Sequence, residues 1–163
     1  MGDFGLARYD TIPMKGYTHE VITLWYRPPE ILLGARDYKS EIDIWSVGCI
    51  LGELVTQRPI FIGKDEETQI NCIFSKLGLP TIEDWPNMED LSGWEKMDIK
   101  LEEDPIGVYG LVPELDAHGL RLLEGMLKSN PKTRISAKQA LESAWFDEVR
   151  DEVEGGGAGD YKA

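Results

Sequence analysis

The first residues of the chain include a carboxylate that could hold a metal ion. Asp3-Phe4-Gly5 offers one oxygen ligand, but a motif of three residues often occurs by chance and says little alone. The motifs that follow it in the sequence support the interpretation as a metal ligand. Downstream, a loop that carries threonines leads to Pro28-Pro29-Glu30. Asp43 then opens an apolar segment, and Arg134 follows Asn130-Pro131. This order and spacing of motifs are hard to obtain by accident.

The same order of motifs is found in protein kinases, which have Ala-Pro-Glu at the place of Pro28-Pro29-Glu30. Residues 17–27 closely resemble the activation segment of cyclin-dependent kinases, and the resemblance extends from Asp3 to about Val149. It implies a mainly α fold, a partial carboxy-terminal lobe of a protein kinase from the Asp-Phe-Gly motif onward. It also implies ATP-dependent phosphoryl transfer to serine or threonine.

The loop also distinguishes branches of this superfamily. Mitogen-activated kinases have a phosphorylatable tyrosine three residues before the threonine that corresponds to Thr23, whereas this chain has Glu20 there. The mitogen-activated branch is therefore disfavoured. Residues 22–30, with proline at Pro28, resemble the transcription-associated and PITSLRE-like members more than the central cell-cycle members.

The resemblance implies a metal site and a phosphorylation site in the loop. Asp3 would hold the Mg²⁺ that bridges the phosphates of ATP. Thr18 would be the activating phosphorylation site, and Arg8 would contact the phosphate. The alternatives are that Asp3 is an ordinary loop aspartate and that Thr18 is an exposed threonine in a mobile loop.

The end of the same loop would bind the protein substrate. By resemblance, Val21 and Ile22 shape the pocket beside the phosphoacceptor and favour proline as the next residue of the substrate. Arg27 is assigned to substrate binding as well. Thr23 would support catalysis by contacting the catalytic aspartate. The implied substrates are therefore proteins with Ser-Pro or Thr-Pro sites.

Four further residues are assigned structural roles by the resemblance. Glu30 and Arg134 would form a buried ion pair that ties the activation segment to the lower lobe. Asp43 would cap backbone amides of the catalytic loop, although an aspartate at a helix start could equally be an ordinary N-cap. Trp45 would lie in the core.

The elements that must position these residues can be read from the apolar pattern. Prolines before a glycine predict a short helix over residues 29–33. Apolar residues cover nearly all sides of residues 40–56, which predicts a central, buried helix. Residues 65–77 and about 116–127 have helical spacing, and Ser136 to Gln139 reads as a capping box that opens a last short helix. Trp145 and Phe146 would close the core.

Three parts of the chain are expected. Residues 1–34 would be the activation segment and the short helix after it, residues 35–150 the helices of the lobe with an acidic insertion at about 80–113, and residues 151–163 a disordered glycine-rich tail. Residues 59–118 contain fourteen acidic and four basic residues. Their net charge is therefore 4 − 14 = −10, out of −13 for the whole chain. We interpret this as a solvated acidic insertion, with a docking surface for a basic partner as the alternative.

Several kinase motifs do not occur in these 163 residues: the glycine-rich loop, the ATP-binding lysine and the His-Arg-Asp loop. The chain begins immediately before the Asp-Phe-Gly motif, so we expect a truncated chain that is inactive alone and binds Mg²⁺ and ATP poorly. An apolar face of the helix between Ile42 and Val55 would then lie exposed. The competing hypotheses are a non-catalytic interaction module or truncated pseudokinase, in which the helices after Gly63 bind a partner, and an unstable relic.

Composition also bears on partners and location. The acidic balance argues against nucleic acid or anionic lipid as a direct partner. No apolar stretch reaches the roughly 18 residues of a membrane span, and no targeting signal is visible, so we expect an intracellular protein of the nucleus or cytoplasm. Because the family binds cyclin mainly through its upper lobe and activation segment, a cyclin is expected to bind the full-length protein rather than this chain.

Overall fold

The computed structural model describes residues 24–100 and 104–150, and within them all regular secondary structure is helical. The predicted mainly α fold is confirmed for this part of the chain. The elements, in chain order, are η1 (Leu24–Tyr26), α1 (Pro29–Leu32), α2 (Glu41–Thr56), α3 (Glu66–Leu77), η2 (Met88–Asp90), η3 (Trp94–Lys96), α4 (Gly107–Leu111), α5 (Ala117–Met126), α6 (Ala137–Leu141) and η4 (Ala144–Phe146), where η denotes a 3-10 helix.

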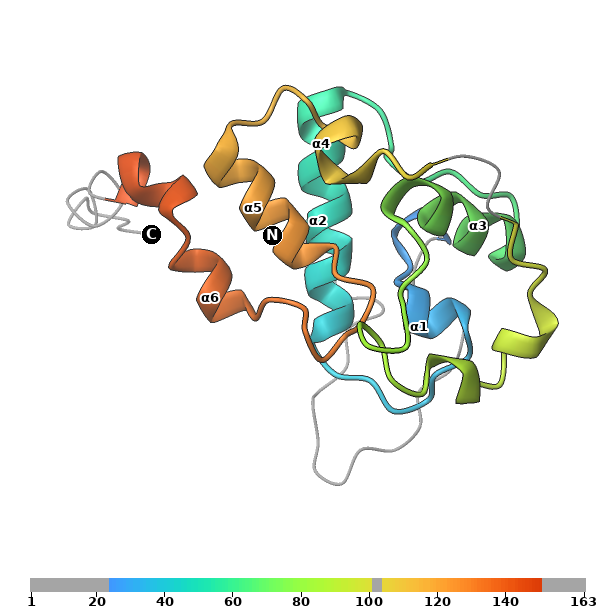
Figure 1. Cartoon of the computed structure of the whole chain (residues 1–163). Helices are drawn as coiled ribbons and strands as arrows, with labels where there is room; N and C mark the ends of the chain where they lie inside the picture. Colours follow the sequence, from blue (N-terminus) through green and yellow to red (C-terminus); the bar gives the residue numbers. More distant parts are fainter. Residues whose placement is uncertain (1–23, 101–103, 151–163) are drawn as a thin grey trace, which may run out of the picture.

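The long helix α2 lies at the centre of the arrangement (Figure 1). Helix α5 packs along one side of it, while α1 and α3 pack against each other on the opposite side. Helix α6 and η4 lie beyond α5, at the end of the chain coloured red (Figure 1). None of the described helices combines the length and the apolar content that a membrane crossing requires.

Side-chain caps fix where three of these helices begin. Asp65, Asp116 and Ser136 each accept a hydrogen bond from the backbone N–H three residues later. Such a bond satisfies an amide that the first turn of a helix leaves without a partner. The capping box predicted at Ser136 is confirmed, and the helices expected at about 65–77 and 116–127 begin and end within a residue of the prediction.

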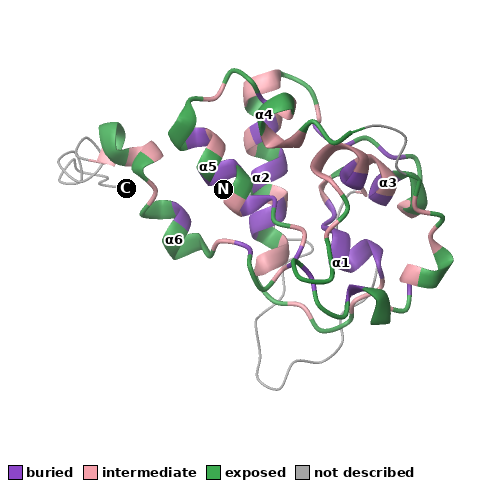
Figure 2. Cartoon of the chain, in the orientation of Figure 1, coloured by how far each residue is buried: buried purple, intermediate pink, exposed green. Residues whose placement is uncertain are grey.

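Helix α2 is buried on one face only. Its buried residues are Ile44, Trp45, Gly48, Cys49 and Gly52. Val47 and Ile50 are each 48% exposed and Leu54 is 65% exposed. The predicted central helix is therefore buried on one face in the described residues, and the expectation of an exposed apolar face agrees with its other face. The physical reason is that α5 and the loop after α2 pack on one face. Figure 2 shows buried, intermediate and exposed residues along α2.

Two hydrophobic clusters make up the core. The larger one includes Trp45, Phe61 and Phe74, which are fully buried, and it joins α1, α2 and α3. The smaller one joins α2, α5 and α6, and Trp145 and Phe146 pack against it as half-buried residues. Their rings form an edge-to-face pair with centroids 5.1 Å apart. The two aromatic residues thus close the smaller cluster, as expected.

Candidate functional site

The described part of the chain begins just after the loop to which most chemistry was assigned. Residues outside it are Asp3, Arg8, Thr18, Val21, Ile22 and Thr23. Their roles therefore stay predictions. The described residues do include the segment that follows directly, residues 24–30, which contains η1 and the start of α1. We call it the anchor segment, and its contacts define the candidate site.

The anchor segment ends in a buried ion pair. The two terminal guanidinium nitrogens of Arg134 donate to the Glu30 carboxylate, Nη1 to Oε1 and Nη2 to Oε2, each at 2.8 Å. The side chains are 0% and 3% exposed. Arg134 also donates to the backbone carbonyls of Glu41 at 2.7 Å and Lys128 at 3.1 Å. The structure therefore brings these two predicted residues together, 104 positions apart in sequence, in the two-pronged geometry that favours arginine over lysine.

Trp45 forms the apolar support of this ion pair. Its ring is 0% exposed and lies 5.2 Å from the guanidinium carbon of Arg134. The Trp45 ring also stacks on the Phe61 ring, with ring centroids 5.8 Å apart and an interplanar angle of 18°. A flat guanidinium over an aromatic face is a favourable electrostatic contact. Trp45 is thus placed in the core, as the sequence suggested, and it contacts the ion pair directly.

Helix α2 holds one side of the anchor segment. The Ser46 hydroxyl donates to the Tyr26 carbonyl at 3.0 Å, and the Tyr26 hydroxyl donates to Glu53 Oε2 at 2.7 Å. The hydrogen bond to Glu53, together with desolvation, raises the pKa of Tyr26 above its ordinary value. Tyr26 therefore stays a neutral donor, so that both its backbone and its side chain tie η1 to α2.

Helix α3 holds the other side. Arg27 Nη1 lies 2.7 Å from Glu66 Oε1 in the first turn of α3, and the Arg27 side chain is only 11% exposed. The Trp25 indole N–H donates to the Gly63 carbonyl at 2.9 Å. A third contact comes from Gln69, which bonds both Trp25 and Gly63. The anchor segment is therefore clamped between α2 and α3.

Asp43 is not the N-cap of α2. Ser40 occupies that position, and Asp43 lies three residues into the helix, where it is exposed. Backbone bonds from the amides of Ile42 and Asp43 to residues 39 and 40 start the helix without a side-chain cap. Although Asp43 is exposed, the protein atoms around it remove enough water to raise the pKa of its carboxyl group. The reading as an ordinary N-cap is wrong, and the contact with a catalytic loop stays a prediction.

The described residues contain no cluster of metal-ligating side chains. No group of three or more His, Cys, Asp or Glu side chains in residues 24–100 and 104–150 could hold a metal ion. Asp3, the carboxylate assigned to Mg²⁺, lies outside these ranges. The described part of the chain therefore contributes the anchor segment and its contacts, and Mg²⁺ and ATP are implied by resemblance alone.

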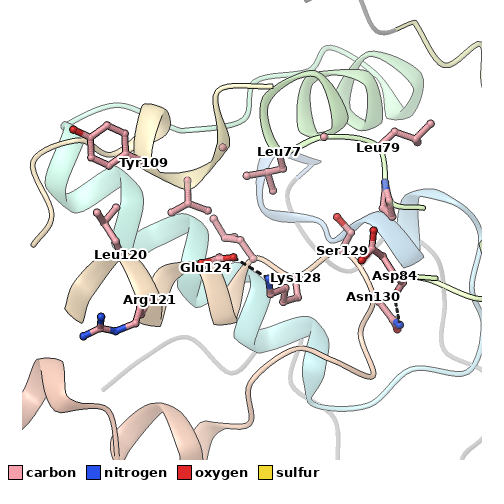
Figure 3. Close-up of a pocket in the computed structure, with 15 residues that line it drawn as sticks. Leu77, Leu79, Asp84, Tyr109, Leu120, Arg121, Glu124, Lys128, Ser129 and Asn130 are labelled. Atoms are coloured by element: carbon pink, nitrogen blue, oxygen red, sulfur yellow. Dashed lines mark hydrogen bonds and ion pairs between the residues drawn. The ribbon is translucent and has the colours of Figure 1, made fainter. Parts of the chain in front are cut away.

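A groove of about 500 Å³ lies elsewhere, between the end of α3, α4 and α5 (Figure 3). Its lining residues already make polar contacts with one another: Lys128 pairs with Glu124 at 2.9 Å, and the Asn130 side chain donates to the Asp84 carbonyl at 2.8 Å. It is lined by no residue of the anchor segment. We therefore do not assign the groove to the candidate site.

The partners of the anchor segment could be read only in part from sequence. The ion pair was predicted from the positions of Glu30 and Arg134 in known motifs. Ser46, Glu53 and Gln69 were missed, because a serine and a glutamate within a helix look like ordinary helix residues. Gln69 had one visible signal, since its neighbours Ile70 and Ile73 mark that face of α3 as apolar.

Comparison with known proteins supplies the family. The family model "Protein kinase domain" matches residues 1–146. The chain is 48% identical over 151 residues to "Cyclin-dependent kinase B2-2" of Arabidopsis thaliana, covering 93% of this chain and 47% of that protein. It is 47% identical over 153 residues to "Cyclin-dependent kinase B2-1" of Oryza sativa subsp. japonica, covering 94% and 46%.

A third relative carries a different name. "Cell division control protein 2 homolog D" of Antirrhinum majus is 48% identical over 149 residues, 91% of this chain and 47% of that protein. The chain thus spans about half the length of the curated relatives it matches. These relatives do not test the transcription-associated or PITSLRE-like subgroup, which stays a prediction. The match over residues 1–146 and these relatives together establish that the chain belongs to the protein kinase family, in its cyclin-dependent type.

Proposed function

We propose that the chain is part of a proline-directed protein serine/threonine kinase that transfers phosphate from Mg²⁺-ATP to serine or threonine before proline. The kinase domain match and the names of the relatives support the reaction class. The observation that carries the proposal in the structure is the buried Glu30–Arg134 pair, which fixes the anchor segment directly after residues 21–23.

The chemistry explains why such an anchor would be needed. Phosphoryl transfer asks a protein mainly to position its reactants and to neutralise charge. A loop that binds the substrate can position it only if the loop is held firmly at its end. The contacts of Tyr26 with α2, of Arg27 with α3 and of Glu30 with Arg134 supply that support from three directions.

We further propose that these 163 residues do not catalyse the reaction alone. The sequence contains no glycine-rich loop, ATP-binding lysine or His-Arg-Asp loop, so it offers neither the phosphate cradle nor the base that accepts the substrate proton. In this proposal the full-length kinase binds ATP and Mg²⁺, with Asp3 as a metal ligand. A cyclin would likewise bind the full-length protein.

A second function is favoured by one observation. The acidic region carries exposed apolar side chains, with Ile82 71%, Ile106 53% and Tyr109 72% exposed. Exposed apolar residues within a charged surface are common at protein interfaces. The alternative is therefore a non-catalytic interaction module that binds a protein partner through this region.

Phosphate transfer separates the two functions. The full-length kinase that carries these residues, its Asp3→Ala variant and the 163-residue chain are each given Mg²⁺-ATP and a peptide with one Ser-Pro site. The proposal expects transfer by the full-length kinase, loss of transfer in the Asp3→Ala variant and none by the 163-residue chain. Transfer by the 163-residue chain would refute the claim that it is inactive alone, and a full-length protein without transfer would favour the interaction module.

A further inference from the structure

Gln69 is the least exposed polar residue in the described part of the chain. It is 0% exposed, although a glutamine is usually found at the surface. It lies in the first half of α3, next to Ile70 and one turn before Ile73, which are both 0% exposed. Burying a polar amide is unfavourable unless its hydrogen bonds are made inside the protein. A specific set of partners must therefore hold it.

The amide of Gln69 joins two separate parts of the backbone. Its Oε1 accepts a hydrogen bond from the Gly63 N–H at 2.6 Å, and its Nε2 donates to the Trp25 carbonyl at 3.3 Å. One planar group thus acts as acceptor on one side and donor on the other, which only asparagine and glutamine can do without charge or tautomers. The Trp25 indole then donates back to the Gly63 carbonyl at 2.9 Å, which closes a ring of hydrogen bonds.

The backbone at Gly63 is packed too closely for any other residue. A Cβ atom at this position would lie 2.4 Å from the backbone N and Cα of Gln69, closer than real Cβ contacts come. Glycine is therefore required there by the close approach of the two backbones. The contact between Gly63 and Gln69 is thus a fixed feature of how the loop before α3 meets the helix.

The same turn of α3 also holds Arg27. Glu66, which pairs with Arg27 at 2.7 Å, lies three residues before Gln69 and therefore on the same face of α3. Gln69 holds the backbone of Trp25, and Glu66 holds the side chain two residues later. The start of α3 consequently determines where residues 25–27 lie.

We propose that Gln69 is a positioning residue for binding of the protein substrate. It acts through the Trp25 carbonyl, by fixing the anchor segment. This segment begins two residues after Ile22, which together with Val21 is predicted to bind the substrate. This role rests on the proposed kinase function. Gln69 touches neither substrate nor ATP in this proposal, so its loss weakens peptide binding and leaves ATP binding unchanged.

The test compares Gln69→Glu with a matched control in the full-length kinase that carries these residues. Glutamate keeps the acceptor for the Gly63 N–H, but it replaces the donor with a negative oxygen opposite the Trp25 carbonyl. Gln139→Glu makes the same chemical change at an exposed position of α6, where glutamate serves the capping box equally well. The measured quantities are KM for a Ser-Pro peptide, KM for ATP and kcat.

We expect Gln69→Glu to raise the peptide KM roughly tenfold, as loss of a buried hydrogen bond implies, with KM for ATP and kcat nearly unchanged. Gln139→Glu leaves all three unchanged. A peptide KM equal to that of the wild type, or a parallel rise of both KM values, would overturn the proposal. Inactivity of the wild-type kinase would instead overturn the proposed function and this role with it.

A second variant guards against misfolding. Gln69→Met has a similar shape and removes both hydrogen bonds without adding charge. If Gln69→Glu does not fold, the same selective rise in peptide KM is expected from Gln69→Met. If neither variant gives a folded kinase, Gln69 is a structural residue of the core and the positioning role is refuted.

Discussion

Replacing Glu30 by alanine removes one partner of a buried ion pair and leaves the other in place. Arg134 keeps its charge, since an arginine side chain does not lose its proton in a protein. Its guanidinium remains 0% exposed and retains only the carbonyl acceptors around it, at Glu41, Lys128 and Ser129. The variant therefore contains a buried charge without a counterion.

The size of the effect follows from two separate estimates. Breaking a buried ion pair by removing one partner destabilises a protein by about 3–5 kcal/mol. The variant also loses the two charge-assisted hydrogen bonds of 2.8 Å that Glu30 accepts, each worth roughly 1.5–3 kcal/mol. The two figures agree, so we expect Glu30→Ala to lower the free energy of unfolding by about 4 kcal/mol. Glu30→Gln also leaves Arg134 without a counterion, and its amide N–H₂ cannot accept the second hydrogen bond, so it should be clearly destabilising as well.

Urea denaturation of the full-length kinase, followed by tryptophan fluorescence, measures this difference. Glu124→Ala is the control, because it removes an exposed pair with Lys128 at 2.9 Å between residues four positions apart. Such surface pairs contribute only about 0.3–0.5 kcal/mol. If Glu30→Ala destabilised the protein no more than Glu124→Ala, the claim that the ion pair fastens the anchor segment would be refuted.

Three further outcomes are expected. Hydrogen bonds donated by nearby threonines hold the pKa values of Asp65 and Asp84 below the ordinary value. Their charged forms therefore stabilise the fold above about pH 4, and this stabilisation is lost as the pH falls through the lowered pKa values. Variants with asparagine at these positions should therefore lose less stability than the wild type when the pH is lowered, as measured by thermal unfolding at several pH values. Ser136→Ala removes the cap of α6 and should cost about 1 kcal/mol in urea denaturation, and an unchanged unfolding midpoint would contradict the capping box. Leu54→Lys should reduce binding of a dye for apolar surfaces and leave stability nearly unchanged, because Leu54 is exposed. Ile73→Ala should lower the free energy of unfolding by about 2–5 kcal/mol, because Ile73 is 0% exposed.

Local signals in the sequence predicted most of the helices. Ser136 with Gln139 predicted the start of α6, because a cap acts within a few residues, and the helical spacing of residues 65–77 predicted α3. The box at Asp65 was missed because its third residue is Thr68 rather than glutamate or glutamine. Its geometry is nevertheless reciprocal, with the threonine hydroxyl accepting from the Asp65 amide.

Tertiary contacts determine what the sequence could not predict. No helix was predicted within the acidic insertion at about 80–113, yet it contains η2, η3 and α4. These short elements are held by distant partners, such as the bond from the Gly93 N–H to the Leu33 carbonyl at 2.9 Å. The clamp on the anchor segment has the same origin, because Ser46 and Gln69 reach it from two different helices. No local pattern encodes such pairings.

The burial of α2 shows the limit of a pattern in another way. Apolar residues on all sides of a helix predict burial on all sides. In the described residues, Val47, Ile50 and Leu54 are exposed, while Trp45 and Cys49 on the other face are 0% and 1% exposed. The apolar pattern indicates which faces of a helix can be buried. The elements that pack against the helix determine which faces are buried.

The most direct test of the proposed function is the choice between two peptides that differ at one position. The full-length kinase that carries these residues is given Mg²⁺-ATP and a peptide with Ser-Pro, or the same peptide with Ser-Ala, and kcat/KM is measured for each. We expect efficient phosphorylation of the Ser-Pro peptide and little of the Ser-Ala peptide. Equal values for the two peptides would contradict proline-directed specificity, and no transfer to either would contradict the assignment as an active kinase.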